Sequence, residues 1–200
     1  MSVAGSRGRG RPRSEKARSA ILAATAELLL EDGLDAVSMD AVAARAGVSK
    51  ATIYRWWPTK ETLALDALYN EWDAVRPRVR KTDSLRGDLL ALVRPWFRLM
   101  TQRPYARVVA ALLTKAQTDL QFAEQYRLQI VAPRREHAAA IFQRAIERGE
   151  IPADTKIDVA MDLLYGPLYH RLIQRTGPLN DRFMRDVVEA VVAALHRERG

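Results

Sequence analysis

Four hydrogen-bonding side chains lie within one six-residue stretch of the sequence. They belong to Lys50, Thr52, Tyr54 and Arg55, directly before a pair of tryptophans. Donors of this kind on a short helix reach base edges and phosphate oxygens when the helix enters the major groove of a duplex. The stretch therefore indicates contact with double-stranded DNA.

The N-terminal residues form a second cluster of cations. Residues 1–20 hold six Lys or Arg against one Glu, so this segment accounts for five units of the formal net charge of +8. The run from Arg9 to Pro12 reads Arg-Gly-Arg-Pro, the core of an AT-hook, whose guanidinium groups suit the narrow minor groove of A·T-rich DNA. We expect residues 1–13 to be a flexible arm in which Arg9 and Arg11 contact DNA. The alternative is a basic tail that only aids solubility.

The sequence has no constellation typical of an enzyme. It contains no cysteine, which excludes disulfides, thiolate metal sites and a cysteine nucleophile. The histidines His137, His170 and His196 lack the spacing of metal ligands, and no glycine-rich phosphate loop follows a strand. No run approaches the ~18 uncharged apolar residues of a membrane span. We expect a cytoplasmic protein without catalytic activity, cofactor, metal or membrane partner.

The elements that position these side chains are all expected to be helices, because apolar residues recur at helical spacing and nowhere alternate as in a strand. With 200 residues, 48% of them hydrophobic, the chain can bury a core. The first helices are expected at 14–32, at 38–47 and from Ser49 to Trp57, where Pro58 must end the third. The second and third of these predict a helix-turn-helix.

The second part of the chain is expected to be a bundle of longer helices. A long pattern covers 122–146 with a proline inside it, and the last two helices are expected at 157–174 and 181–197. The expected domains are a basic arm (1–13), a helix-turn-helix domain (14–58), a linking helix (59–80) and a C-terminal helical domain (81–200), with about nine helices in total. The fold class is therefore all-α.

The run from Ala46 to Leu63 resembles the TetR family of transcriptional regulators. It reads Ala-Gly-Val-Ser-Lys-Ala-Thr-Ile-Tyr-Arg-Trp-Trp-Pro-Thr-Lys-Glu-Thr-Leu, and the resemblance covers 14–68, with Trp57 where the family commonly has phenylalanine. It implies that the short third helix is the recognition helix. The residues implied to contact DNA are Lys50, Ala51, Thr52 and Arg55 nearest the bases, and Tyr54, Lys60 and Ser38 at phosphates. From the residues alone, Tyr54 can equally be a packing aromatic and Lys60 a solvated charge at a helix end.

Beyond about residue 68 the resemblance is one of layout only. It implies a C-terminal domain that binds a ligand and forms a homodimer through the last two helices, so that the dimer meets a palindromic operator. It also implies a repressor that a small-molecule effector releases from DNA. From the residues alone, the valine-rich final helix is too apolar to face water, but it can bury its apolar stripe within the monomer instead.

Aromatic residues of the C-terminal domain are candidates for an effector pocket. The candidate ligand-binding residues are Trp96, Tyr126, Tyr165, Tyr169 and His170, for a mainly apolar small molecule. For each of them, ordinary core packing is the alternative. The alternative function is an architectural DNA-binding protein without a ligand, and a cavity among the C-terminal helices distinguishes the two. A metabolite-binding bundle without a DNA role is opposed by the helix-turn-helix and the arm together.

Overall fold

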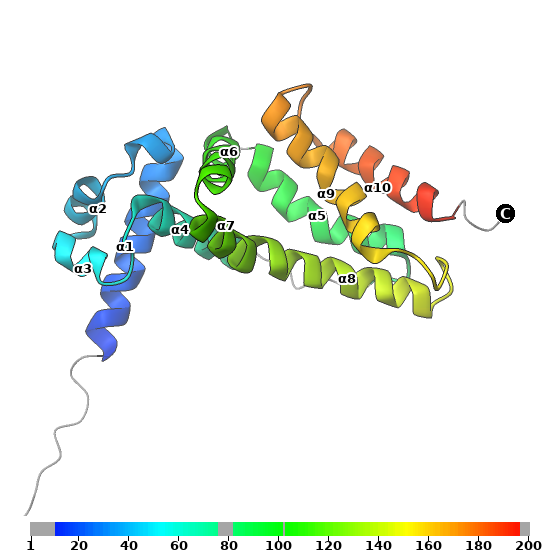
Figure 1. Ribbon diagram of the computed structural model, residues 1–200, viewed down its shortest axis with the longest axis horizontal. Coiled ribbons are helices and arrows are strands. Elements are labelled where there is room, and N and C mark those ends of the chain that lie inside the picture. Colours follow the sequence, from blue (N-terminus) through cyan, green and yellow to red (C-terminus); the bar gives the residue numbers. More distant parts are fainter. Residues whose placement is uncertain (1–10, 76–81, 102, 197–200) are drawn as a thin grey trace, which may run out of the picture. The chain divides into compact units, whose positions relative to one another are not determined.

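The computed structural model describes residues 11–75, 82–101 and 103–196, and all regular structure in these ranges is helical (Figure 1). The helices are α1 (Arg11–Asp32), α2 (Met39–Ala46), α3 (Lys50–Tyr54), α4 (Lys60–Val75), α5 (Leu85–Thr101), α6 (Arg103–Thr118), α7 (Leu120–Tyr126), α8 (Ala132–Glu147), α9 (Ile157–Gln174) and α10 (Asp181–His196), with a 3₁₀ turn, η1 (Leu34–Ala36), and a π-helical segment, η2 (Arg127–Val131). The segments α7, η2 and α8 follow one another without a break. Counted as one, they leave nine α-helices in the described ranges, and the all-α prediction is confirmed.

The chain divides into two compact units, Met1–Glu71 and Trp72–Gly200, and α4 contributes residues to both. In the N-terminal unit, α1 packs on α2 and α2 packs on α3. The buried core of this unit includes Ile21, Leu22, Leu28, Leu29, Val37, Val42, Ile53, Leu63 and Leu65. Thr25 is the polar member of this core, and its hydroxyl donates to the Ile21 carbonyl at 2.7 Å. The helical spacing of the apolar residues thus gives α1 the buried face that holds the helix-turn-helix.

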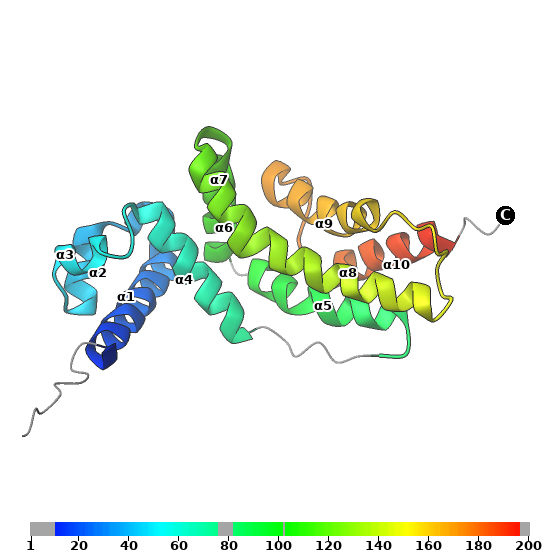
Figure 2. The same ribbon diagram turned by 60° about the horizontal axis from the view of Figure 1, so that its bottom comes forward.

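In the C-terminal unit, α5 packs against α6, α8 and α10, and α9 packs against α6, α8 and α10 (Figures 1 and 2). The buried core includes Leu89, Val93, Phe97, Val108, Leu112, Ile141, Phe142, Leu164 and Leu168. The valines of α10, Val187, Val188 and Val191, are also buried, and α10 lies against α5. The final helix therefore buries its apolar stripe within the monomer, which is the alternative that the sequence left open.

A proline inside the long helical run has a local structural consequence. Pro133 has no N–H to donate to a carbonyl one turn earlier. The five residues directly before Ala132 adopt the wider π-helical turn of η2, and α8 then starts with Pro133 in its first turn. The π-helix is rare and occurs mostly as a single turn inside an α-helix, as it does here. The predicted long helix over 122–146 is thus present with a change of pitch.

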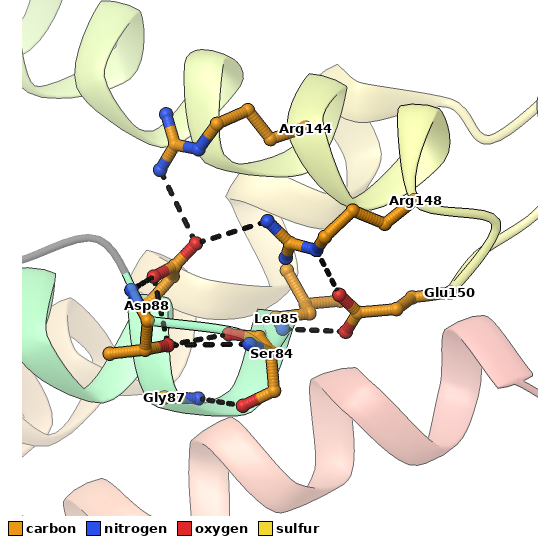
Figure 3. A network of polar contacts seen from close by, with 8 residues as sticks. Ser84, Leu85, Gly87, Asp88, Arg144, Arg148 and Glu150 are labelled. Carbon is orange, nitrogen blue, oxygen red and sulfur yellow. Dashed lines mark hydrogen bonds and ion pairs between the residues drawn. The ribbon is translucent and has the colours of Figure 1, made fainter.

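A network of polar contacts joins the N-terminus of α5 to the C-terminal end of α8 (Figure 3). Its centre is Asp88, whose side chain is fully buried and accepts from the backbone N–H of Thr82 at 2.6 Å and from the Thr82 hydroxyl at 2.9 Å. Arg144 and Arg148 approach the other carboxylate oxygen at 3.3 and 3.7 Å. Glu150 accepts from the backbone N–H of Leu85 at 2.6 Å and also binds Arg148. These contacts link segments more than fifty residues apart in the sequence.

Candidate functional site

The turn between α2 and α3 is formed by short-range side-chain and backbone contacts. The hydroxyl of Ser38 accepts from the N–H of Ala41 at 3.1 Å and caps α2, and Gly47 ends that helix in the left-handed region with φ 64°. Ser49 caps α3 by accepting from the N–H of Thr52 at 3.3 Å. Each contact satisfies a helix-end group that has no partner in its own helix. The predicted helix-turn-helix is confirmed.

One face of α3 is buried and the rest is open to solvent. Ile53 is completely buried, whereas Tyr54 has 53% of its surface exposed. Lys50, Ala51 and Arg55 are exposed as well, and Thr52 is half-buried. The exposure of Tyr54 argues against the alternative that it is a packing aromatic. The structure thus places all five side chains predicted to contact DNA from α3 on its accessible surface.

Three of these side chains have protein partners in the structure. The ammonium of Lys50 lies 3.0 Å from a carboxylate oxygen of Asp40, and this hydrogen bond raises the pKa of Lys50. The hydroxyls of Thr52 and Ser49 are 2.9 Å apart. The guanidinium of Arg55 stacks over the Trp56 ring at 5.9 Å. Asp40 was missed by sequence reasoning, and its carboxylate holds Lys50 in place on the surface of the helix-turn-helix.

The remaining predicted DNA contacts lie at helix starts. Ser38 is exposed at the N-terminus of α2. Lys60 is the first residue of α4, and its side chain is half-buried. Arg9 lies outside the described residues. Arg11 is the first residue of α1, so this helix begins three residues before the start expected at Ser14. Pro12 is compatible with a first helical turn, where N–H groups have no intrahelical acceptor.

Trp57 has a role that the sequence did not reveal. Its side chain is 3% exposed, and its indole N–H donates to a carboxylate oxygen of Asp66 on α4 at 2.8 Å. Arg18 of α1 approaches the same oxygen at 3.4 Å and lies 5.7 Å from the Trp57 ring centre. A phenylalanine, which is common at this position in the resembling family, has no such donor. Trp57 therefore ties the end of the recognition segment to α4.

Replacing Trp57 with Phe is expected to lower the free energy of unfolding by about 1–3 kcal/mol, because a hydrogen bond and buried ring volume are removed together. Urea unfolding measures the change. Trp56→Phe is the matched control, since the Trp56 side chain is half-buried and its indole makes no hydrogen bond to any described residue. Equal effects of the two substitutions would show that the bond to Asp66 contributes nothing.

A cavity of about 370 Å³ lies in the C-terminal unit between α6, α7, η2, α8 and α9. It is lined by Leu113, Tyr126, Val131, Arg134, Arg135, Asp162, Tyr165, Gly166, Tyr169 and Ile173. A water molecule occupies about 30 Å³ in the liquid, so the cavity has the volume of roughly a dozen waters. That size is within the range of sites for small organic molecules.

The residues predicted from sequence to bind a ligand fall into three positions. Tyr126, Tyr165 and Tyr169 line the cavity. Trp96 is buried and lies behind the lining, with its ring centre 5.7 Å from that of Tyr169. His170 is exposed and does not line the cavity. Ligand binding by these residues remains a prediction.

Arg134 is a cavity residue that sequence reasoning missed. Its guanidinium lies 4.6 Å from the ring centre of Trp72 and 5.1 Å from that of Trp96, and its Nη1 donates to the hydroxyl of Tyr169 at 3.1 Å. A single arginine on a helix normally extends into solvent, so the sequence contains no signal for this position. Only the packing of α8 against its neighbours shows it.

Two other classes of site have no counterpart in the described ranges. No group of three or more His, Asp or Glu side chains there is arranged to hold a metal ion. None of the helices in those ranges is both long and apolar enough to cross a membrane.

Comparison with known families and proteins agrees with this geometry. The family described as "Bacterial regulatory proteins, tetR family" matches residues 21–67, and "Tetracyclin repressor-like, C-terminal domain" matches residues 79–191. The HTH-type transcriptional regulator YdeS of Bacillus subtilis is 39% identical over 180 residues, which cover 90% of each chain.

Two further relatives also match nearly the whole chain. The DNA-binding transcriptional repressor TetR of Mycobacteroides abscessus is 33% identical over 185 residues, covering 92% of this chain and 96% of the relative. The crystal structure of the TetR family transcription regulator SCO0332 superposes with a TM-score of 0.76 at 36% identity, covering 89% of this chain and 97% of that one. With both family matches and an intact helix-turn-helix, the chain belongs to the TetR family of DNA-binding transcriptional regulators.

Proposed function

We propose that the protein is a cytoplasmic, homodimeric repressor that binds a palindromic operator and leaves it when a small molecule occupies the cavity of the C-terminal unit. The observation on which this proposal depends is the cavity of about 370 Å³, because an architectural DNA-binding protein needs no such space. The relative from Mycobacteroides abscessus is a repressor, which favours repression over activation. No catalytic role is proposed.

The experiment that tests this function has two stages. First, the full chain selects duplexes from a random pool, and a palindromic consensus is expected because a two-fold dimer presents two recognition helices. Second, small molecules that bind the protein are added to the complex with the selected duplex, and release is measured by fluorescence anisotropy. Failure to enrich any duplex contradicts sequence-specific binding, and retention of DNA with every bound ligand contradicts effector release.

We propose the following contacts with the operator. Lys50, Ala51, Thr52 and Arg55 lie nearest the bases, whereas Tyr54, Lys60 and Ser38 contact phosphates. This assignment is supported by the exposure of α3 and by the position of Ser38 and Lys60 at helix starts. Arg9 and Arg11 are proposed to reach the minor groove beside the helix-turn-helix.

Base contacts and phosphate contacts are expected to respond differently to substitution. Arg55→Ala and Thr52→Ala should change base preference at one or two operator positions, by ~1–3 kcal/mol per good contact. Lys60→Ala and Tyr54→Phe should weaken binding about equally on all sequences. Binding to an array of operator variants measures both. A changed base preference for Lys60→Ala, with uniform weakening for Arg55→Ala, would reverse the assigned roles.

Removal of residues 1–10, which precede α1, should weaken operator binding and reduce the preference for A·T-rich flanks. The dependence of log affinity on log salt concentration should flatten by about 0.9 for each phosphate that the shortened protein no longer neutralises. Titrations at several salt concentrations measure this slope. An unchanged affinity and slope would identify the segment as a solubilising tail.

The proposed homodimer is supported by an exposed face of α9. Val159, Leu163, Gly166, His170 and Ile173 recur at alternating spacings of four and three residues, and all five are exposed; Gly166 and Ile173 also line the cavity. This is the spacing at which one helix packs along another. The exposed alanines of the adjacent α10 at positions 190, 193 and 194 would allow close approach of a partner. His170, predicted from sequence as a ligand residue, is thus part of the face proposed for dimerisation.

The cavity wall contacts the part of α4 that belongs to the C-terminal unit. Arg134 lines the cavity and stacks on Trp72, and Trp72 lies on α4, the helix that starts at Lys60. A ligand changes DNA affinity only if it binds one arrangement of the helices better than another. We propose that ligand contact with Arg134 shifts α4 through Trp72.

A further inference from the structure

The guanidinium of Arg134 is a cation without a counter-ion in the cavity wall. No carboxylate of the described residues lies within 4 Å of it, although ion pairs occur at many other arginines in the same ranges. Its Nη1 donates to the Tyr169 hydroxyl, while its Nε is buried and has no acceptor. The edge formed by Nε and Nη2, which suits the two oxygens of a carboxylate, therefore has no partner among the described residues.

The neighbouring cation in the cavity wall, Arg135, differs from Arg134 because it has counter-ions. Arg135 binds Asp162 at 2.6 Å and Asp158 at 3.1 Å, and the first of these hydrogen bonds is the main cause of its raised pKa. Both aspartates are largely exposed, at 71% and 86% of their side-chain surface. Asp162 is thus engaged at the solvent side of the cavity, and it does not neutralise Arg134.

The aromatic residues around Arg134 stabilise its charge without neutralising it. The faces of Trp72 and Trp96 attract the cation, and both rings exclude water from it. Burial raises the pKa of Tyr165 to about 12 and also raises that of Tyr126, so both phenols are neutral at physiological pH. The hydroxyl of Tyr169 accepts from Arg134 and also interacts with Tyr126, so its own proton can be donated to Tyr126 or to a ligand oxygen.

The rest of the lining is mainly hydrocarbon. Leu113, Val131 and Ile173 contribute side chains, and apart from its chain neighbours and the nearby backbone of its own helix no heavy atom lies within 4 Å of the position where a Cβ of Gly166 would stand. A ligand that fills this space is therefore apolar over most of its surface, with one polar group at Arg134.

We propose that the effector is an apolar molecule with a single carboxylate, which binds the guanidinium of Arg134 and accepts from the hydroxyl of Tyr169. This inference rests on the proposed function, because it names the chemical class of the molecule that occupies the same cavity. One guanidinium edge matches the single charge and planar shape of a carboxylate. The apolar body of the molecule lies against Leu113, Val131 and Ile173.

The test compares probes that differ only in the charged group. Decanoate and decanamide form one pair, 4-phenylbutyrate and its amide form the second, and decylamine is the cationic counterpart. Binding to the full-length protein without DNA is measured by calorimetry at neutral pH. At least one acid is expected to bind about tenfold or more tightly than its amide, since hydrogen bonds between charged groups are the stronger ones. Decylamine is expected to bind more weakly than decanoate.

Three variants identify the residue responsible. Arg134→Gln should abolish the preference for the acid over the amide, and Arg134→Lys should retain part of it, because the charge remains without the planar fork. Arg127→Gln is the matched control: it removes the same charge from the same helical run, but Arg127 is paired with Glu124 and does not line the cavity. Its preference for the acid should equal that of the wild-type protein. If Arg134→Gln does not fold, the wild-type probe pairs and Arg134→Lys still decide the question.

The outcomes separate this inference from the function on which it rests. The carboxylate inference is overturned if each acid binds no more tightly than its amide. It is also overturned if neither acid binds. A preference that survives in Arg134→Gln also overturns it. Operator release is measured separately with the same probes: an acid that binds through Arg134 but leaves DNA affinity unchanged contradicts effector release and leaves the assigned charge recognition intact.

Discussion

Asp88→Ala is expected to lower the free energy of unfolding by about 3–5 kcal/mol, the range for removing one partner of a buried ion pair. The carboxylate of Asp88 is fully buried and has four partners: the N–H and hydroxyl of Thr82, and the guanidinium groups of Arg144 and Arg148. Without it, Arg144 loses its counter-ion, Arg148 keeps only Glu150, and the N–H of Thr82 loses its acceptor. Of the network in Figure 3, only the contacts of Glu150 with Leu85 and Arg148 then remain between the start of α5 and the end of α8. Urea unfolding of the full chain measures the loss.

The same carboxylate makes stability depend on pH. Burial alone raises the pKa of Asp88, but hydrogen bonds from Thr82 and Arg144 outweigh burial and hold the pKa below its ordinary value of 3.8. A group whose pKa is lower in the folded than in the unfolded protein stabilises the fold above its unfolded pKa. The contribution of Asp88 is therefore complete near neutral pH and is lost as pH falls below about 4. In Asp88→Asn, this part of the acid destabilisation should be absent.

Asp83→Ala is the matched control for both measurements. Asp83 lies five residues earlier and is exposed, so removing its carboxylate should change the free energy of unfolding by no more than about 0.5 kcal/mol. If Asp88→Ala destabilised the protein no more than Asp83→Ala does, the buried network would not contribute to the stability of the C-terminal unit.

The DNA-binding unit could be predicted from sequence because its signals are local. The caps at Ser38 and Ser49, and the left-handed turn at Gly47, each involve groups only a few residues apart. Residue type and spacing then determine where α2 and α3 start and where α2 ends, whereas α3 ends at Tyr54, three residues before the end expected at Trp57. The start of α1 was predicted wrongly because two local signals compete there. Ser14 is a good capping residue, but Pro12 is also compatible with a first helical turn, and the helix starts at Arg11.

The contacts that shape the C-terminal unit have no local signal. Arg134 meets Tyr169 across 35 residues, and Asp88 meets Arg144 across 56. An arginine on a helix has the same appearance in the sequence whether it extends into water or lines a cavity. The aromatic residues could be identified as apolar, but only packing separates Tyr126, which lines the cavity, from Trp96, which lies behind it.

Helical periodicity shows that a helix has an apolar stripe, but it does not show whether the same chain or a partner covers that stripe. The valines of α10 are buried against the same chain, so their pattern is no evidence for a partner. Three of the large exposed apolar residues of the C-terminal unit share one face of α9: Val159 and Ile173 each have 55% of their surface exposed and Leu163 has 46%, whereas Leu120 and Leu128 are exposed singly on α7 and η2. Large exposed side chains on one face of a helix are typical of an interaction surface. Evidence for the proposed dimer therefore comes from α9.

Leu163→Arg is expected to convert the protein to a monomer and to lower its affinity for a palindromic operator by about 10²–10⁴-fold. Leu163 lies in the middle of the exposed face of α9, so two arginines would meet near the two-fold axis without counter-ions. A dimer gains operator affinity because binding of one half-site raises the effective concentration of the second recognition helix, and a monomer lacks this gain. Sedimentation equilibrium measures the assembly, and anisotropy titration measures DNA affinity.

Binding to a duplex with a single half-site separates loss of the dimer from loss of the fold. The α3 surface belongs to the N-terminal unit and is unaltered in Leu163→Arg, so its affinity for the single half-site should equal that of the wild-type monomer. Leu128→Arg is the matched control, because Leu128 is 54% exposed in η2, outside α9, and the variant should remain dimeric. A dimeric Leu163→Arg with full operator affinity would place the dimer interface on another surface. A monomeric Leu163→Arg with full operator affinity would instead mean that each recognition helix binds independently, and the operator would then need no two-fold symmetry.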